Sequence, residues 1–216
     1  QGGTPELHIT EHFDPGTGDY TLAVAQHTPA TPGQDLKLPL LVPLRYALYD
    51  ASGAAIPALP ECDAPVHPGW VELVAERHVL RWPGLGARPL PAFNHGFAAP
   101  VKLHFDYSAA DLARLAQLER DPFNRWDLVQ QLAMAALLDG GAQSEAATAL
   151  SQAIAALLDD DAADPAFLAD AAQAAREASL AESTQWSFAG RVSVDAAGEG
   201  GSGRMGWSQQ GDDFEI

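Results

Sequence analysis

The sequence predicts a mixed fold in which β-structure precedes α-structure: an antiparallel β-sandwich, then an α-helical array, then a short β-hairpin tail. Three observations predict it. Short alternating apolar runs between Pro and Gly turns fill residues 1–108, a pattern typical of a sandwich. Apolar residues recur at helical spacing in residues 109–172. Residues 173–216 are richer in Gly and Ser, and two strand patterns flank a glycine-rich turn there.

The expected strands of residues 1–108 each have one apolar face, because apolar and polar side chains alternate along them. Proline fixes φ and lacks an N–H, so the Pro- and Gly-rich stretches between them are expected to be turns and loops. The expected strands cover residues 7–10, 20–25, 40–49, 54–56, 70–75, 78–82 and 100–107.

The second segment carries helix start signals as well as helical spacing. Ser108 followed by Asp111 is a capping signature for a first helix. Proline is favoured at the first position of a helix because its missing N–H would be unpaired there in any case. Asp121-Pro122 is expected to end the first helix, a second helix to open at Phe123, a third at Ser144 and a fourth at Pro165.

The composition excludes several classes of function. The 216 residues include 12 Lys and Arg against 29 Asp and Glu, which gives a formal net charge of −17. Binding to phosphates requires clustered basic residues, so neither a nucleic acid nor an anionic membrane surface is an expected partner. No apolar run is long enough for a membrane span, and no signal-peptide pattern is visible. Cys62 is the single cysteine, which excludes intrachain disulfides and fits a reducing compartment.

One pentapeptide resembles a metallopeptidase motif. His8-Ile9-Thr10-Glu11-His12 matches H-x-x-E-H, in which two histidines on one helix face bind zinc and the glutamate is the base. The residues between them favour a strand, and the turn at residues 14–16 follows too soon for a helix. On a strand His8 and His12 share one face while Glu11 points to the other. A surface strand is therefore expected, and an autonomous metallopeptidase is the alternative.

The other candidate residues are also expected to be structural. Residues 198–203 match G-x-G-x-x-G, but a dinucleotide motif leads into a helix and a strand pattern follows here; a hairpin turn over residues 195–202 is expected. Cys62 is expected to be an inert thiol, and the acidic run 159–161 a solvated loop. The seven histidines are at positions 8, 12, 27, 67, 78, 95 and 104. We assign no catalytic, cofactor-binding or metal-binding residue.

A series of short motifs runs in order along residues 3–127. They are Gly3-Thr4-Pro5, Tyr20-Thr21-Leu22, QHTPATPGQ at 26–34, Leu48-Tyr49-Asp50, AAPVKL at 98–103 and DPFNRWD at 121–127. The series resembles the post-catalytic region of bacterial aminopeptidase N, a zinc gluzincin that removes N-terminal amino acids from peptides. That family commonly has Arg where His27 stands.

The resemblance implies an immunoglobulin-like (Ig-like) sandwich in residues 1–108 and the start of a helical C-terminal domain, a truncated array, in residues 109–172. The family's zinc motif, H-E-x-x-H, is absent, so the chain is expected not to be an enzyme as it stands. It would be a non-catalytic accessory portion that supports the catalytic domain and the cavity admitting the peptide. Zinc, the peptide substrate, and the missing catalytic and helical domains belong to the full-length parent, expected in the cytoplasm.

The tail differs from that family. Trp186, GRVSV at 190–194, GGSG at 200–203 and Trp207 resemble the start of the outer-membrane lipoprotein receptor LolB. That resemblance implies an incomplete barrel around an apolar cavity for acyl chains. We interpret the joint as a chimera of gene prediction or assembly, with a seam between Asp170 and Trp186. The alternative function is lipoprotein handling at the outer membrane through this tail.

Overall fold

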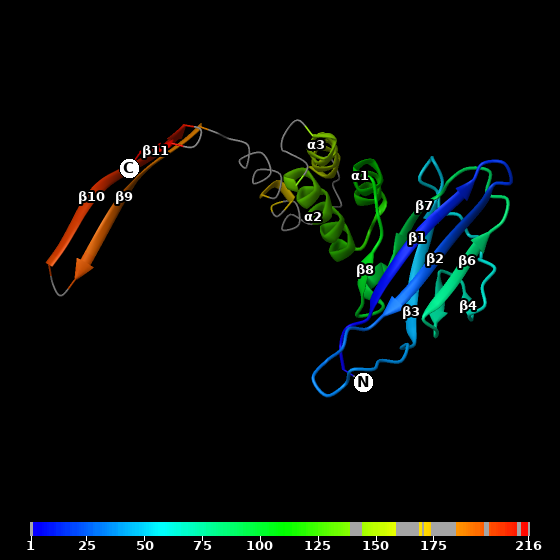
Figure 1. The fold of residues 1–216 in the computed structure, drawn as a ribbon. Helices are drawn as coiled ribbons and strands as arrows, with labels where there is room; N and C mark the ends of the chain where they lie inside the picture. The colour runs from blue at the N-terminus through cyan, green and yellow to red at the C-terminus, as the bar shows by residue number, and fades with distance from the viewer. Residues whose placement is uncertain are drawn as a thin grey trace.

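The computed structural model describes residues 2–138, 144–158, 169, 171–173, 185–196, 199–210 and 213–215. Figure 1 shows a β-domain, a group of helices beside it and a separate C-terminal hairpin. The order of elements follows the predicted order of sandwich, helical array and hairpin.

The β-domain consists of two four-stranded sheets. One has the order β6-β2-β1-β8 and the other the order β4-β5-β3-β7. The first sheet contains β1 (Glu6–Asp14), β2 (Asp19–His27), β6 (Arg77–Trp82) and β8 (Lys102–His104). The second contains β3 (Val42–Tyr49), β4 (Val66–His67), β5 (Trp70–Leu73) and β7 (Leu90–Phe93).

Most strand pairs are antiparallel as predicted, but one is not. β8 pairs with β1 in parallel, with Leu103 opposite Leu7. The expected strand at 54–56 is only an isolated bridge between Ala55 and Tyr49. β7 was not predicted, because Leu90, Pro91 and Ala92 are all buried and do not alternate.

The sandwich core lies between the two sheets and follows the period of two. Along β6, Leu80 and Trp82 are buried while Val79 and Arg81 face out. Trp82 is fully buried, contacts Tyr46 edge-to-face at 5.5 Å between ring centroids, and donates its indole N–H to the carbonyl of Ala58 at 3.1 Å. A buried Trp is tolerated in this way because its N–H has a partner.

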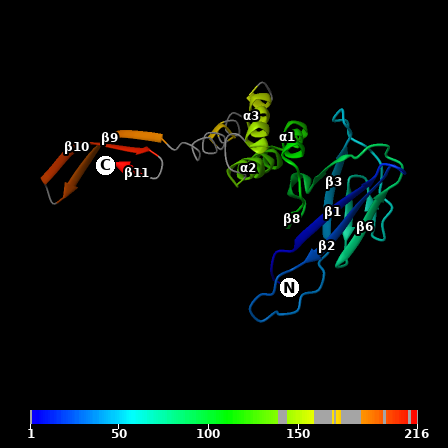
Figure 2. The ribbon, with the colours of Figure 1, turned by 45° about the horizontal axis from the view of Figure 1, so that its top comes forward.

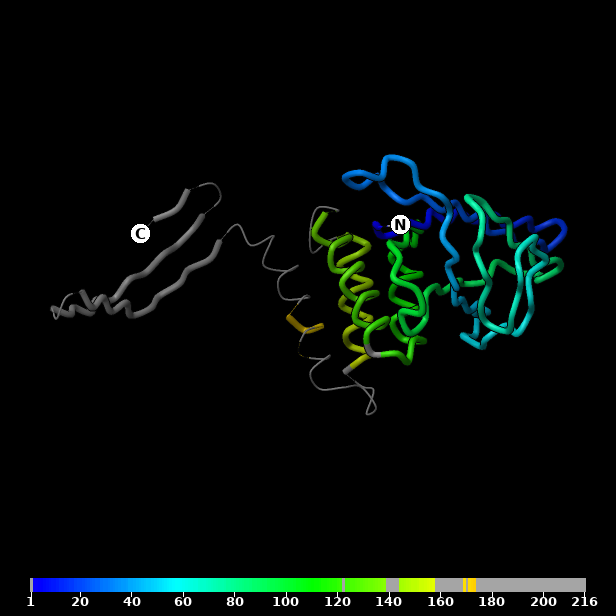
Figure 3. The backbone as a smooth tube through the Cα atoms, turned by 90° about the horizontal axis from the view of Figure 1, so that it is seen from below, coloured from blue at the N-terminus to red at the C-terminus, as the bar shows by residue number. Residues whose placement is uncertain are grey.

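Three helices pack together next to the β8 edge in both ribbon views, and the tube view shows them side by side (Figures 1, 2 and 3). They are α1 (Ala109–Leu118), α2 (Pro122–Leu138) and α3 (Glu145–Leu158). The predicted caps are confirmed: Ser108 Oγ accepts from the Asp111 N–H, and Ser144 Oγ from the Ala147 N–H. The expected helix start at Pro165 lies outside the described residues, but residues 169 and 171–173 are helical and Ala171 is buried in the helical core.

The C-terminal hairpin pairs β9 (Gln185–Ala196) with β10 (Glu199–Gln210), and β11 (Asp213–Glu215) pairs with β10. The expected turn over residues 195–202 was too long. Glu199 pairs with Ala196, so the paired strands continue through the glycine-rich sequence and only residues 197 and 198 separate them. The G-x-G-x-x-G residues from Glu199 onward therefore lie on a strand.

We expect Trp82→Ala to reduce the free energy of unfolding by about 3–5 kcal/mol, the usual cost of removing a buried aromatic ring. Val79→Ala is the matched control on the same strand, because Val79 is 53% exposed. The control should change stability by less than about 0.5 kcal/mol. Urea denaturation followed by circular dichroism measures both, and equal effects would contradict this assignment of the core face.

Candidate functional site

The H-x-x-E-H segment lies entirely within strand β1, which separates its three side chains. His8 and His12 are exposed on the outer face, as predicted. Glu11 turns the other way, where its carboxylate accepts a hydrogen bond from the hydroxyl of Tyr20 at 2.7 Å. This geometry does not aim Glu11 at a water bound by the two histidines, as the metallopeptidase chemistry requires.

Glu11 instead takes part in an ion-pair network centred on Arg88. The Arg88 guanidinium donates to Glu11 Oε1 through Nε at 2.9 Å and Nη2 at 2.6 Å. The same Nη2 lies 3.0 Å from Oδ2 of Asp111, in the first turn of α1. Its hydrogen bonds to Asp111 and Glu11 raise the pKa of Arg88 against the opposing effect of burial. We call this three-residue network the Arg88 bridge; it connects the first strand to the first helix.

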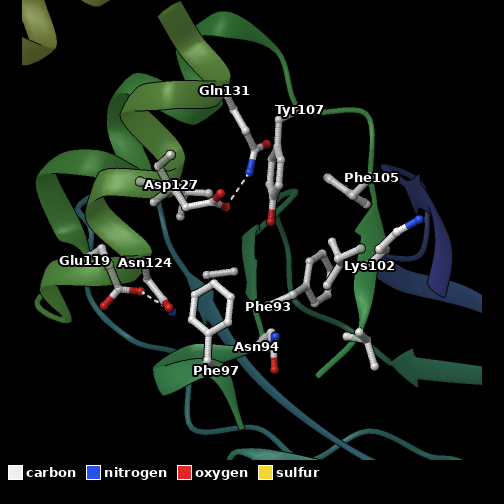
Figure 4. A pocket seen from close by; sticks show the side chains of 15 residues that line it. Phe93, Asn94, Phe97, Lys102, Phe105, Tyr107, Glu119, Asn124, Asp127 and Gln131 are labelled. Carbon is white, nitrogen blue, oxygen red and sulfur yellow. Dashed lines mark hydrogen bonds between the residues drawn. The ribbon is translucent and has the colours of Figure 1, made fainter. Parts of the chain in front are cut away.

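A cleft of about 510 Å³ lies between the sandwich and the helices (Figure 4). Its β-side wall is aromatic: Phe93 packs edge-to-face on Phe105, which packs on Tyr107. Its helical wall is mixed: Leu115 and Leu128 lie there together with polar groups such as Asp127, which accepts a hydrogen bond from Gln131 at 2.8 Å. The cleft combines an apolar floor with a few polar groups, which is the usual make-up of a binding pocket.

Glu119 is the most strongly perturbed carboxylate of the cleft. Its Oε2 lies 2.8 Å from Nδ1 of His95, and its Oε1 accepts the backbone N–H groups of Arg120 and Asp121 at 2.7 and 3.0 Å. Burial raises the pKa of Glu119, but the His95 hydrogen bond and these N–H groups outweigh it and lower the pKa to about 2. Glu119 is therefore a fixed negative charge at neutral pH.

The loop that carries His95 has an unusual backbone. Asn94, Gly96 and Phe97 have φ of 56°, 62° and 48°, a region that costs side-chain-bearing residues energy. Asn94 holds this shape, because its side chain bonds both the N–H and the carbonyl of Ala99 at 3.0 Å. The loop presents Phe97, 47% exposed, edge-to-face against Phe123 of α2. Phe97, which lines the cleft, is thus held by an aromatic contact with α2.

Two histidine clusters that spacing did not reveal come together in the described residues. One contains Glu6, His8 and His104, and the other Cys62, Asp63 and His78. Burial raises the pKa of the Cys62 thiol, in agreement with the prediction of an inert thiol. The sequence does contain a hint of the first cluster. Glu-Leu-His at 6–8 and Lys-Leu-His at 102–104 are similar alternating triplets, which would place both histidines on the same face if the two strands were paired. The acidic run 159–161 lies outside the described residues.

Comparison with known families gives two consecutive matches. The Ig-like domain of unknown function DUF3458 matches residues 3–106. The ARM-repeat domain of unknown function DUF3458_C matches residues 109–193. The second match overlaps the segment from residue 173 that the sequence assigns to a LolB-like tail. Among the described residues, no helix is long and apolar enough to cross a membrane.

Similar proteins are aminopeptidases. Aminopeptidase N of Escherichia coli is 34% identical over 176 residues, covering 79% of this chain and 20% of that protein. Aminopeptidase N of Haemophilus influenzae is 37% identical over 132 residues, 61% of this chain and 15% of that protein. The crystal structure of Legionella pneumophila aminopeptidase A with aspartic acid gives a TM-score of 0.60 at 25% identity, covering 79% of this chain and 18% of that chain. The chain thus spans a fifth or less of these relatives.

A short second similarity concerns a different protein. The outer-membrane lipoprotein LolB of Xanthomonas campestris is 44% identical over 45 residues, which is 21% of this chain and 21% of that protein. A match of this length describes a segment and not a whole fold.

We expect Arg88→Ala to destabilise the protein by about 1 kcal/mol, the upper range for partly exposed ion pairs, and the loss to shrink at high salt. Arg77→Ala is the control, because Arg77 is an exposed arginine of β6. A double-mutant cycle with Asp111→Asn measures the coupling across the two domains. If the stability losses of the two single mutants simply add up in the double mutant, the bridge contributes no coupling energy between the domains.

The lowered pKa of Glu119 predicts that the free energy of unfolding decreases in acid. Its pKa is lowered to about 2 from an ordinary 4.5, so the ionised carboxylate stabilises the folded state above about pH 4.5. That stabilisation is lost as the pH falls from there through about 2. We expect Glu119→Gln to cost on the order of 2 kcal/mol at pH 6, with wild type and variant converging near pH 2. Urea denaturation across this pH range measures the difference in stability, with Asp127→Asn as the control. A difference between wild type and Glu119→Gln that does not change with pH would contradict the prediction.

Proposed function

Because the chain belongs to the DUF3458 family, carrying its Ig-like domain and then its ARM-repeat domain, we propose that it is a non-catalytic accessory portion of a zinc aminopeptidase N. In this role the sandwich supports the catalytic domain, and the helices help to enclose the cavity that admits the peptide. The observation that carries the proposal is the order of the two family matches over residues 3–193. The relatives are about four times longer than this chain and are named for the peptidase activity.

The internal geometry supports a structural role. The Arg88 bridge and the buried Leu115, which packs with Leu90 and Ala92 of β7, fix the first helix against the sandwich. A supporting domain has to hold its neighbours in a defined arrangement, and this requires well-packed contacts between its own parts. Glu11, the only acidic residue of the H-x-x-E-H segment, is already used in that bridge.

The missing partners in this proposal are the catalytic domain and the remaining helices of the parent. The end of α2 supports it, because Met134 and Leu138 are 56% and 80% exposed. Clustered apolar side chains of this kind commonly mark a surface that another part of the protein covers. Zinc would be bound by the parent's H-E-x-x-H motif, and a cytoplasmic location stays a prediction.

We expect the purified chain not to hydrolyse L-alanine p-nitroanilide, with or without added zinc, because the base and the two histidines of the H-x-x-E-H segment point apart. Glu11→Gln should leave the background rate unchanged. Hydrolysis that requires Glu11 would overturn the proposal and favour the autonomous metallopeptidase.

A segment exchange with a relative tests whether this chain supports a catalytic domain. Residues 3–158 replace the matching segment of the Escherichia coli relative, and the hybrid is compared with a version lacking that segment. The hybrid is expected to recover activity that the deletion loses. Recovery reduced by Arg88→Ala, but not by Arg77→Ala, would assign the effect to a fixed sandwich–helix arrangement. A deletion that is as active as the hybrid would contradict the accessory role.

The alternative function, lipoprotein handling through the tail, rests on the LolB similarity over 45 residues. An acylated peptide distinguishes the two: binding that is lost on deletion of residues 173–216 would favour this alternative. Continuous sequencing of the source DNA across codons 160–190 tests the proposed seam directly. Helical-domain sequence running on past residue 170 would show that the tail is artificial.

A further inference from the structure

A patch of four ionisable residues lies on the outer face of the first sheet, at its β8 edge. In the parallel pairing of β1 with β8, His8 stands opposite His104 and Glu6 opposite Lys102. Residues two apart on a strand face the same side, so all four side chains share one face. Both histidines are about half exposed, at 54% and 48%.

Glu6 connects the two histidines. Its Oε2 lies 3.9 Å from Nε2 of His8 and 3.7 Å from Nε2 of His104. The ligand atoms of the three residues all lie within 4.8 Å of one another. The imidazole rings are stacked, with centroids 4.4 Å apart and planes 6° from parallel. Two imidazole nitrogens and one carboxylate oxygen therefore converge on one small volume.

We propose that Glu6, His8 and His104 form a surface binding site for a divalent transition-metal ion of the Zn²⁺ type. Two imidazoles and a carboxylate are a donor set that suits such ions. Tetrahedral zinc with bonds of about 2.0–2.2 Å needs ligand atoms roughly 3.3 Å apart. The observed Nε2–Oε2 separations are a few tenths of an ångström longer. Rotation of the two exposed rings out of their stack closes that difference and turns both lone pairs toward the ion.

Lys102 positions the carboxylate without occupying the site. Its Nζ lies 3.1 Å from Oε1 of Glu6, whereas Oε2 faces the histidines. This contact holds Oε1 toward Lys102 and leaves Oε2 on the side of the two histidines. The Lys102 side chain is 64% exposed and has room to swing toward solvent when a cation binds.

The second cluster, Cys62 with Asp63 and His78, does not meet the same requirement. Nε2 of His78 accepts the backbone N–H groups of Val74 and Ala75, both at 3.0 Å. Its Nδ1 therefore carries the proton and lies 2.8 Å from Asp63. Neither ring nitrogen has a free lone pair for a metal, and the buried ring is held by the strand ends around it.

A metal at Glu6, His8 and His104 would join β1 to the edge strand β8, four residues before the cap of α1. Because the ion binds the folded arrangement, it should raise the thermal stability in proportion to its concentration relative to Kd. This inference concerns residues of the chain itself and does not depend on the proposed function.

The test is titration of the full chain with ZnCl₂ by isothermal calorimetry, together with the melting temperature. Wild type is expected to bind one equivalent and to melt at a higher temperature with zinc. His104→Gln should weaken zinc binding at least tenfold and abolish the thermal shift. Losing a group that only supports a metal ligand already costs about tenfold or more in affinity, and His104 is proposed as a ligand itself. His12→Gln is the matched control, since His12 lies exposed on the same face of β1.

The outcomes distinguish the possible sites. Equal weakening by His12→Gln and His104→Gln, or unchanged binding in His104→Gln, would overturn the proposal, as would no saturable binding in wild type. Dependence on Cys62, tested by Cys62→Ser, would move the site to the other cluster and also overturn it. Folding of each variant is checked by circular dichroism without metal. Paramagnetic Co²⁺ gives a second measurement, with NMR broadening expected first at the rings of His8 and His104.

Discussion

The Arg88 bridge is the interaction on which the arrangement of the two domains depends. One guanidinium pairs with both Glu11 at the inner face of β1 and Asp111 in the first turn of α1. Without Arg88 those two carboxylates would meet at the junction, and like charges at close range repel. The chain brings Arg88 there from the segment between β6 and β7, so three separate parts of the sequence must fold before the bridge exists.

Side chains along β1 alternate between the two faces of the sheet, and the two sets have different roles. Leu7 and Ile9 enter the core, Glu11 turns inward to the bridge, and His8 and His12 remain outside. A helix-type zinc motif cannot operate on this geometry, because its base and its ligands lie on opposite faces. The same alternation has a second consequence, since the neighbouring strand places His104 beside His8. Ligand sets on sheets come from adjacent strands, and spacing along one strand does not reveal them.

The sequence-based predictions succeeded where structure is local. Alternation along β2 and β6 and the Ser108 cap are each encoded within a few residues. They failed where the partner is remote. β7 is buried along most of its length, so its apolar run has no period, and the parallel pairing of β8 joins residues about a hundred positions apart. The cleft was missed for the same reason, because its aromatic and polar walls belong to different segments.

Helix α1 makes the boundary between the domains a shared core rather than a hinge. Its residues Leu112 and Ala116 belong to the helical core, whereas Leu115 belongs to a second cluster with Leu90 and Ala92 of β7. Leu115 is 1% exposed, and separating the domains would return it to water at a cost of about 2 kcal/mol. A rotation of the helices would break that contact and the Arg88 bridge together. The cleft lies between the same elements, so a segment that binds there would contact the sandwich and the helices together.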